Sequence, residues 1–361
     1  MDRRSFLTGA AAAGMLAADP LRGITLPQDS PPTDGFQETT PEQIAAVKRG
    51  LDYLARIQTR SGGIGQAAPV AFTSLAALAF MASGSTPTRG PYATNLMNAL
   101  KFIMRNKTQN GYLNEGGGGI RGAGGSGMHG HGFALLFLSE LYGMCGETSD
   151  QVGDESVREA ISRAIRVTEH AQDPTGGWYY GPNPSGHEGS VTITQVQALR
   201  AARNAGFQVS QKTIDKGISY IKKSTASDGT IMYQLGMGGH VSYPLTAAGA
   251  CVYAYYGIYE GDEVTRCAKA MFEFITGRRP GGRGGHDFYA HFYAGQACFF
   301  MKRKDLKFWT EGYTRIRKEL LQSQNKGSGN WAGDGYDGSF GTACACLVLQ
   351  IPNRLLPIFQ D

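Results

Sequence analysis

The sequence predicts a closed ring of helices, an (α/α)6 toroid built from six helix pairs. Three observations lead to this prediction. One plan recurs six times along the 361 residues: an amphipathic helix, a glycine-rich turn and a second helix of small and apolar residues. The second helices recur roughly every fifty residues, a period typical of stacked helix pairs. The last of them is as apolar as the middle ones, so the array has no polar cap and is expected to close on itself.

Each repeat can be aligned on one residue near the start of its second helix. These anchors are Thr73, His131, Thr194, Thr246, Tyr293 and Thr342. The turns before them contain residues 61–64, 110–113, 173–178, 227–230, 281–285 and 328–331. The first outer helix shows the three-four spacing of an amphipathic helix, with Ile44, Val47, Leu51, Leu54 and Ile57 on one face. The second helices are apolar nearly all round, so they are expected to form a buried inner ring.

Composition is consistent with one domain. The fifty-one glycines cluster in the turns, where backbone with positive φ is needed, so a disordered glycine-rich chain is excluded. The net charge of +5 is modest, and no stripe of Lys and Arg with interleaved aromatic residues is present. A nucleic-acid partner is therefore not expected.

The N-terminal residues predict an export signal, and the alternative is a frayed basic N-terminus. Arg3 and Arg4 precede an alanine-rich apolar run that reaches Ala18, which resembles a twin-arginine signal. The run, of about twelve residues, is too short to span a membrane. We expect residues 1–18 to be the signal peptide, residues 19–41 a disordered linker and residues 42–361 the toroid. The protein is expected in the periplasm or elsewhere outside the cytoplasm.

The cysteines point to buried thiols rather than to metal ligands. Five of the six lie in apolar helical contexts: Cys145, Cys251, Cys298, Cys344 and Cys346. A free cysteine commonly behaves as a small core residue. No Cys-x-x-Cys pair with zinc spacing occurs, so no metal site and no cofactor is predicted.

Polar residues at the starts of the inner helices are expected to converge on the central cavity of a closed ring. The candidate ligand-binding residues are His129, His131, Tyr243, Tyr289 and Tyr293. The candidate catalytic residues are Asp287, His291, His240, Asp334 and Asp337. Six of the seven histidines lie in such positions, and histidine serves as acid, base or ligand near neutral pH. For each histidine the alternative is a hydrogen-bonded structural residue.

The aromatic residues also have two interpretations. Tyr243, Tyr289 and Tyr293 either line a pocket whose π faces stabilise a cation or pack between helices. Trp178 and Trp331 occupy the same slot after a glycine in their repeats, which favours a structural role.

The turn motifs resemble those of a known superfamily. The segments Gln172–Trp178 and Gln324–Trp331 are similar to the Gln-Gly-Trp repeats of squalene and other triterpene cyclases. The segment Asp287–Tyr293 looks like the Asp-Phe-Tyr-His segment of protein prenyltransferase β subunits. The resemblance covers residues 42–358. This region best resembles the broad group of exported bacterial proteins with prenyltransferase and squalene-oxidase repeats. The resemblance implies the α/α toroid fold.

The sequence departs from both enzyme families at their reactive groups. Triterpene cyclases carry an Asp-x-Asp-Asp motif whose acid protonates an alkene, and the nearest match here is Asp334-Gly335-Tyr336-Asp337. Prenyltransferases hold zinc with an Asp-x-Cys pair and a histidine. Ala290 stands at the position of that histidine, and His291 comes one residue later, which turns a helical side chain by about 100°. Zinc is therefore not expected.

The loss of both motifs favours a non-catalytic toroid. Such a protein would bind a hydrophobic ligand, such as an isoprenoid or a lipid, or an exported protein in its central cavity. A second hypothesis is an active enzyme on an isoprenoid substrate, with Asp287 or Asp334 as acid and with Tyr289 and Tyr293 stabilising a cation. The fold alone does not decide between these functions.

A third hypothesis is an exported polysaccharide lyase or hydrolase. In it His240 and Tyr243 would act as base and acid, and the arginines Arg278, Arg279 and Arg283 would neutralise a uronate. The alternative for these arginines is a solvated basic loop.

Overall fold

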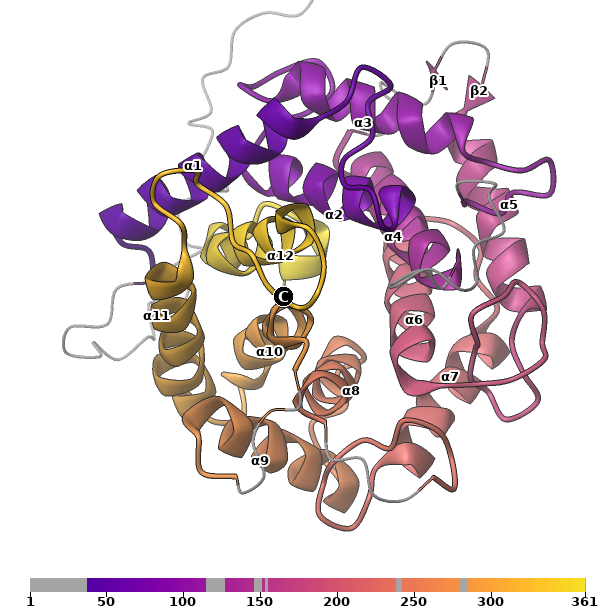
Figure 1. Cartoon of the computed structure of the whole chain (residues 1–361). Coiled ribbons are helices and arrows are strands. Elements are labelled where there is room, and N and C mark those ends of the chain that lie inside the picture. Colours follow the sequence, from indigo (N-terminus) through magenta and orange to yellow (C-terminus); the bar gives the residue numbers. More distant parts are fainter. Residues whose placement is uncertain are drawn as a thin grey trace, which may run out of the picture. The chain divides into compact units, whose positions relative to one another are not determined.

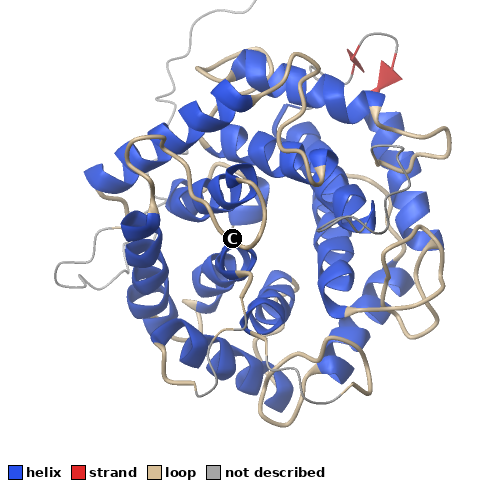
Figure 2. Cartoon of the chain, in the orientation of Figure 1, coloured by secondary structure: helices blue, strands red, loops and turns tan. Residues whose placement is uncertain are grey.

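The computed structural model describes residues 38–114, 127–145, 151–152, 155–237, 242–279, 283 and 285–360. Within this part of the chain, twelve α-helices form two concentric rings (Figure 1). Helices and their connecting loops make up nearly all of the described chain, and two-residue strands β1 (Gln151–Val152) and β2 (Glu155–Ser156) form one small hairpin (Figure 2). The predicted (α/α)6 toroid is confirmed.

Outer and inner helices alternate along the chain. The outer helices are α1 (Pro41–Ile57), α3 (Ala93–Arg105), α5 (Val157–His170), α7 (Gln211–Ser224), α9 (Asp262–Thr276) and α11 (Thr314–Ser323). The inner helices are α2 (Pro69–Ala82), α4 (Gly127–Cys145), α6 (Gly189–Asn204), α8 (Tyr243–Tyr255), α10 (Asp287–Met301) and α12 (Gly338–Gln350). The outer helices bury one face each, whereas α2, α8 and α12 are buried along almost their whole length.

The predicted buried face of α1 is wrong at the start of the helix. Val47, Leu51 and Leu54 are buried as expected, but Ile44 is 60% exposed and Gln43 is buried in its place. The buried stripe is therefore rotated by one residue at the start of the helix. Ile44 faces a pocket that is described below.

In the described residues, five of the six turns are hydrogen-bonded to the inner helix that follows them. A backbone N–H of the turn donates to a side chain near the start of that helix, over 2.7–3.3 Å. The turn residue and its partner are Ile64 and Thr73, Leu113 and His131, Trp178 and Thr192, Ile231 and Thr246, and Trp331 and Thr342. Four of the five partners are threonines, so His131 takes the place of a threonine.

Two of the predicted anchors are wrong. In the third repeat the equivalent residue is Thr192, because Thr194 bonds across the ring instead. In the fifth repeat His291 is the fifth residue of α10, as His131 is of α4 and Thr342 is of α12. His291, rather than Tyr293, is therefore the anchor. The error in both cases is two residues, which rotates a helical side chain to a different face.

The two tryptophans that follow a glycine are structural, as predicted. The indole N–H of Trp178 donates to the Thr168 carbonyl over 2.7 Å, and that of Trp331 donates to the Leu320 carbonyl over 2.7 Å. Both side chains are fully buried. Each satisfies its one polar atom on the outer helix of its own repeat and packs against a glycine of the next outer helix, Gly217 for Trp178 and Gly50 for Trp331.

The ring closes because the last repeat packs against the first. Gln324 donates to the Ala46 carbonyl of α1 and to the Gly329 carbonyl of its own turn, both over 2.9 Å. In the third repeat Gln172 makes the equivalent pair of bonds. It donates to the Thr213 carbonyl of the next outer helix and to the Gly176 carbonyl of its own turn. Helix α12 packs against α1 and α2. The interface between the two ends of the array is therefore built like those inside it.

The C-terminal segment lies near the middle of the ring in the view of Figure 1. It contains the short 3-10 helix η4 (Pro357–Phe359), and both Ile358 and Phe359 are buried. The Ile358 N–H donates to the Glu140 carboxylate over 2.9 Å, and the Tyr255 hydroxyl donates to the Ile358 carbonyl over 3.0 Å. Residues of α4 and α8 thus hold this segment over the C-terminal ends of the inner helices.

Several other expectations can be compared with the structure. Cys251, Cys298, Cys344 and Cys346 are buried thiols, as predicted, and Cys145 is half-buried. Among the described helices none is both long enough and apolar enough to cross a membrane. The predicted signal peptide, most of the predicted linker and His240 lie outside the described residues.

Candidate functional site

Three hydrogen bonds connect α6 and α10, two inner helices that have α8 between them in chain order. The Tyr289 hydroxyl donates to the Ser190 carbonyl over 3.3 Å. One layer deeper the hydroxyls of Thr194 and Tyr293 are 3.5 Å apart. In the third layer Gln197 donates to Gln296 over 3.0 Å. The side chains of the ring therefore meet across its lumen at three levels.

Exposure falls with depth through these layers. Ser190 and Tyr289 are partly exposed, whereas Tyr293 and Gln296 are fully buried. The Phe133 ring of α4 also packs edge-on against Phe292 of α10, with centroids 6.4 Å apart. Between α6 and α10 the lumen is thus occupied by side chains below its first layer, and the partly exposed residues lie at the mouth, at the N-terminal ends of the inner helices.

The centre of the mouth is a chain of three polar groups. The Glu188 carboxylate accepts hydrogen bonds from the Ser190 hydroxyl and N–H, each 2.9 Å long, and from the Val191 N–H. The Ser190 hydroxyl also lies 3.1 Å from the His129 Nε2. Glu188 is the N-cap of α6, where a carboxylate is favoured by the free N–H groups of the first turn.

The surroundings of these groups change their pKa values. Burial raises the pKa of Glu188 to about 7, although its hydrogen bonds from Val191 and Ser190 act in the opposite direction. Burial lowers the pKa of His129 to about 4, so its imidazole is neutral at pH 7. His129 is nevertheless partly exposed.

Three tyrosines from two turns surround this centre. Tyr179 and Tyr180 stack on each other with ring centroids 4.4 Å apart, and the Tyr180 ring lies 6.5 Å from that of His129. The hydroxyls of Tyr180 and Tyr233 are hydrogen-bonded. All three tyrosines are partly exposed. We call the set Tyr179, Tyr180, Tyr233, Tyr289, His129 and Ser190 the mouth cluster.

A second polar group lies at the start of α10. The Asp334 carboxylate accepts the N–H of Phe288 over 2.8 Å and that of Tyr289 over 3.4 Å. Burial raises its pKa, although these hydrogen bonds act against the shift. The backbone at Asp334 is left-handed, with φ of 61°. The Oδ1 atom of Asp287 is buried and has no hydrogen-bond partner.

The predicted site residues divide into those in the mouth and those behind it. His129 and Tyr289 belong to the mouth cluster, and Tyr293 lies one layer deeper. His131 does not face the lumen: its Nε2 lies 3.0 Å from the Thr168 hydroxyl and its Nδ1 accepts the Leu113 N–H. His131 is therefore buried between α4 and α5.

Tyr243 and His291 also lie between the two rings. The Tyr243 hydroxyl lies 3.1 Å from His291 Nδ1, and His291 Nε2 lies 3.5 Å from the Glu319 carboxylate of α11. Burial alone raises the pKa of Glu319, but hydrogen bonds from His291, Arg283 and Arg315 outweigh it and hold that pKa well below its usual range. This buried network joins α8, α10 and α11.

The remaining candidates have local roles. Asp337 is exposed and is the N-cap of α12, where it accepts the Ser339 N–H over 2.9 Å. Arg283 forms two hydrogen bonds with Glu319, and Arg279 pairs with Asp228 and Glu273. Two of the three arginines proposed to neutralise a uronate are therefore already neutralised by carboxylates.

Ser190 and Tyr233 were not among the residues predicted for the site, whereas Tyr180 was one of the aromatic residues that could line a pocket. Tyr180 lies in a turn three residues after Gly177, and Tyr233 lies in a turn two residues after Ile231. In a turn no helical spacing indicates the direction of a side chain. The position of these tyrosines after each repeat's turn motif was the available signal. Among the described residues no group of three or more His, Cys, Asp or Glu side chains is placed to hold a metal ion.

No protein-family model matches the sequence, and no curated protein matches it either. Solved structures do resemble it. An α-1,6-mannanase from Salegentibacter sp. HEL1_6 is 11% identical, with a TM-score of 0.62 over 87% of this chain and 99% of that one. The type II terpene cyclase MstE from Scytonema is 14% identical, with a TM-score of 0.57 over 87% and 98%. An α-amylase from Clostridium perfringens is 12% identical, with a TM-score of 0.56 over 84% and 97%.

At these identities the similarity shows the fold. The α/α toroid fold that the chain shares with terpene cyclases is confirmed. Two of these three neighbours act on carbohydrates by name, which the sequence resemblance did not indicate. The narrower resemblance to exported prenyltransferase-repeat proteins stays a prediction.

Proposed function

We propose that the protein binds an oligosaccharide at the mouth of its ring, outside the cytoplasm. The observation that carries this proposal is the mouth cluster: partly exposed tyrosine rings and hydroxyls, a neutral imidazole and a serine hydroxyl, above a lumen that is occupied by side chains between α6 and α10.

The chemistry of the mouth cluster suits a sugar. One face of a pyranose ring presents C–H groups, which pack on an aromatic ring, while its edge presents hydroxyls that need hydrogen-bond partners. Tyrosine offers an apolar face and a polar end in one side chain. Tyr179 and Tyr180 supply stacked rings, and Tyr233 and His129 supply polar atoms within reach of them.

A hydrophobic ligand deep in the cavity fits less well. An isoprenoid is expected to occupy an apolar cavity that excludes water. In this ring the second and third layers are occupied by Thr194, Tyr293, Gln197 and Gln296. Both layers are polar and already hydrogen-bonded, so we place the ligand at the mouth rather than below it.

Binding without turnover is favoured by the positions of the carboxylates. Glycoside hydrolysis needs two carboxyl groups that flank the scissile bond. Glu188 is fully buried and bonds to its own helix start, and Asp337 caps α12. Variants of the neighbouring mannanase with two consecutive aspartates replaced are described as inactive, and this chain has no two consecutive aspartates.

One observation favours a second candidate function, hydrolysis of the bound saccharide. Asp334 has a raised pKa and Asp287 has an unpartnered Oδ1, and both lie at the start of α10 near Tyr289. Glycoside hydrolysis uses two carboxyl groups, one as acid and one as base or nucleophile. In this candidate Asp334 would be the acid and Asp287 the base.

The extracytoplasmic location rests on the arginine pair and the apolar run of residues 1–18. An exported protein meets polysaccharides of the cell envelope and its surroundings, which agrees with a saccharide ligand. Replacing Arg3 and Arg4 together by lysine is expected to leave the protein in the cytoplasm, and cell fractionation measures this.

A glycan array with the full-length protein tests the proposed function, followed by calorimetric titration with each bound glycan and with α-1,6-mannotetrose. Tyr180→Ala and Tyr289→Ala are each expected to weaken binding about two- to tenfold, since an aromatic contact contributes about 0.5–1.5 kcal/mol. Tyr142→Ala is the matched control, because Tyr142 packs on Phe207 near the C-terminal end of α4. Its affinity should equal that of the wild type.

Chromatography of the same mixtures separates the two candidates. Unchanged glycan supports binding alone, whereas shorter products that disappear in Asp334→Asn support hydrolysis. The absence of any bound glycan, or equal affinity of the wild type and both tyrosine variants, contradicts a saccharide site at the mouth.

A further inference from the structure

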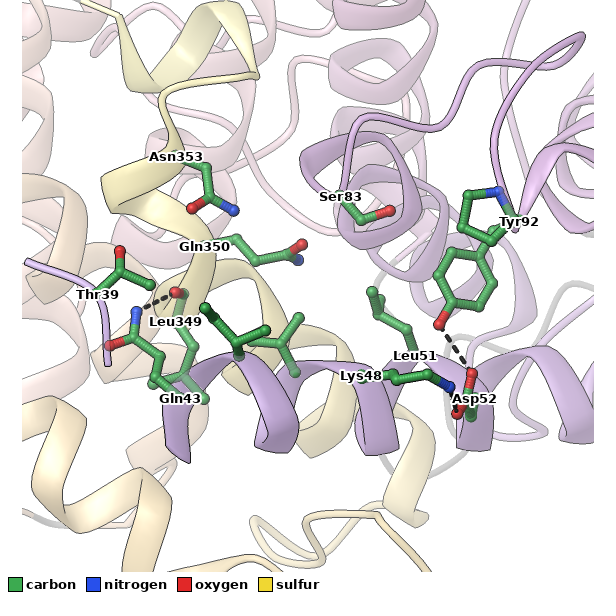
Figure 3. Close-up of a pocket in the computed structure, with 13 residues that line it drawn as sticks. Thr39, Gln43, Lys48, Leu51, Asp52, Ser83, Tyr92, Leu349, Gln350 and Asn353 are labelled. Atoms are coloured by element: carbon green, nitrogen blue, oxygen red, sulfur yellow. Dashed lines mark hydrogen bonds and ion pairs between the residues drawn. The ribbon is translucent and has the colours of Figure 1, made fainter. Parts of the chain in front are cut away.

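A second site lies away from the mouth, where α2 and α12 end. A pocket of about 450 Å³ is lined by α1, the last turn of α12 and the segment that follows α2 (Figure 3). This volume is in the range of small-molecule sites. The pocket shares no lining residue with the mouth cluster, so a ligand in this pocket is independent of the proposed saccharide site.

One wall of the pocket is aliphatic. Val47, Leu51 and Leu349 are buried in its floor, and Ile44 stands at its rim with 60% of its surface exposed. Ile44 is the most exposed of the large apolar side chains in the described chain. Ile44 extends the apolar wall to the surface, where an apolar group of a ligand can pack on it.

A fixed hydrogen-bond acceptor points into the same space. The Gln350 side chain is only 1% exposed, and its amide nitrogen donates to the carbonyls of Ala79 over 3.1 Å and Cys346 over 3.0 Å. Both amide hydrogens are therefore used, which fixes the orientation of the amide. Its Oε1 atom receives no hydrogen bond, and Figure 3 shows this amide in the space between Asn353, Ser83 and Leu51.

Other polar groups lie at the edge of the pocket. The exposed Asn353 amide can donate and accept, and it lies on the Gln350 side in Figure 3. At the other end Lys48 and Tyr92 both bond to Asp52, over 2.6 Å and 2.8 Å. This end carries one charge of each sign, so it selects no net charge in a ligand.

We propose that this pocket binds a short extended peptide with an aliphatic side chain. The peptide N–H donates to Gln350 Oε1, the peptide carbonyl accepts from Asn353, and the aliphatic side chain covers Val47, Leu51 and Ile44. The lining residues of α1 run from Gln43 to Asp52, a rise of about 13 Å. An extended peptide of about four residues has the same length.

Other ligand classes match the pocket less well. A plain hydrocarbon would cover Gln350 Oε1 without a donor, and leaving a buried acceptor unpaired opposes binding. A saccharide supplies donors, but the floor here is made of branched aliphatic side chains rather than of aromatic faces. An amide flanked by an aliphatic group supplies both the donor and the apolar surface.

Methyl NMR of the full-length protein with N-acetyl-leucine methylamide as probe tests this site. For a probe of this size we expect a dissociation constant of about 1 mM and saturable shifts confined to the methyl groups of Ile44, Val47, Leu51 and Leu349. The analogue with both amide nitrogens methylated has no N–H donor. It should bind about fivefold more weakly, the factor expected for one lost hydrogen bond.

A protein variant provides a second, independent test of this site. Ile44→Lys places a charge at the rim and should weaken binding of the probe at least about fivefold, and the exposure of Ile44 lets the variant fold. Leu306→Lys is the matched control, because Leu306 is 41% exposed and lies outside the pocket. Its affinity should be unchanged.

Two results would overturn the proposal. One is the absence of shifts at these methyl groups up to about 20 mM probe, twentyfold above the expected dissociation constant. The other is equal binding of the probe and its methylated analogue, which would identify an unspecific apolar cavity. Neither result bears on saccharide binding at the mouth.

Discussion

At the scale of single residues, buried hydroxyls and imidazoles hold the turns in place. Trp331 N–H donates to the Thr342 hydroxyl over 2.9 Å, and Thr192 does the same for Trp178. In the second repeat His131 has this role, so a histidine at the start of an inner helix is structural there. The residue type alone does not distinguish this role from a place in the mouth.

We expect Thr342→Val to lower the free energy of unfolding by about 1–3 kcal/mol, because it leaves the buried Trp331 N–H without an acceptor. Thr342→Ser retains the hydroxyl and should cost less. Urea unfolding of both variants measures the difference. Equal losses would mean that the hydroxyl contributes nothing.

The buried carboxyl group of Glu140 is expected to make the stability of the protein depend on pH. Burial raises the pKa of Glu140 in the folded protein to about 8, partly offset by the hydrogen bond from Ile358 and the charge of Arg200, whereas an unfolded glutamate has a pKa of about 4.3. Between these values the folded state binds the extra proton, so stability falls as pH rises from about 4 to about 8. Below this range both states are protonated and the effect vanishes.

Glu140→Gln keeps an acceptor for the Ile358 N–H and cannot ionise. We therefore expect the variant to match the wild type near pH 4 and to become more stable than it toward pH 8, by at most about 5 kcal/mol. Chemical unfolding at several pH values measures this. The other carboxyl groups with raised pKa values, Glu188 and Asp334, are present in both proteins and cancel in the difference. A difference that does not change with pH would contradict the raised pKa.

At the scale of elements, the C-terminal segment packs against the inner ring. Leu356, Ile358 and Phe359 are buried, whereas Leu355 is 41% exposed. The segment bonds to α4 through Glu140 and to α8 through Tyr255. It therefore links α4 and α8, two inner helices that have α6 between them in chain order.

Two substitutions in this segment measure its contribution. Ile358→Ala is expected to cost about 2–5 kcal/mol of unfolding free energy, the usual range for a buried isoleucine. Leu355→Ala, three residues earlier, should stay within about 0.5 kcal/mol of the wild type. Thermal or urea unfolding compares them. Similar small effects of both would show that the segment is not packed in solution.

At the scale of the whole molecule, closure makes the two ends of the array equivalent to its interior. The turn glycine Gly329 has φ of 85°, and an added Cβ would lie 2.6 Å from the Arg49 carbonyl oxygen of α1. Inside the array Gly176 has φ of 98°, and its Cβ would lie 2.3 Å from the Lys216 carbonyl oxygen. The closing interface is thus as tight as an internal one.

We expect Gly329→Ala and Gly176→Ala to lower stability by similar amounts, about 2–5 kcal/mol each, from the left-handed backbone and the clash together. Gly335→Ala isolates the backbone part, because Gly335 has φ of 73° and open space around it. It should cost about 1–2 kcal/mol. If Gly329→Ala cost no more than Gly335→Ala, α1 would be free to move away and the ring would open in solution.

The repeat, the inner and outer helices and the closed toroid follow from the sequence because they depend on short-range patterns. The spacing of apolar residues assigns each helix to a ring, and the glycine-rich turns mark the joints between them. The structural role of Trp178 and Trp331 could also be predicted, since both recur in one slot of the repeat.

Only the tertiary structure decided which polar residues share a site. His129 faces the mouth and His131 faces α5, although they are two residues apart, because each residue turns a helical side chain by about 100°. The mouth cluster joins residues of α4, α6 and α10 with two turns, and the pocket joins the first helix to the last. Such groupings depend on the rotation of each helix and on ring closure, which are set by packing between repeats and leave no local pattern in the chain.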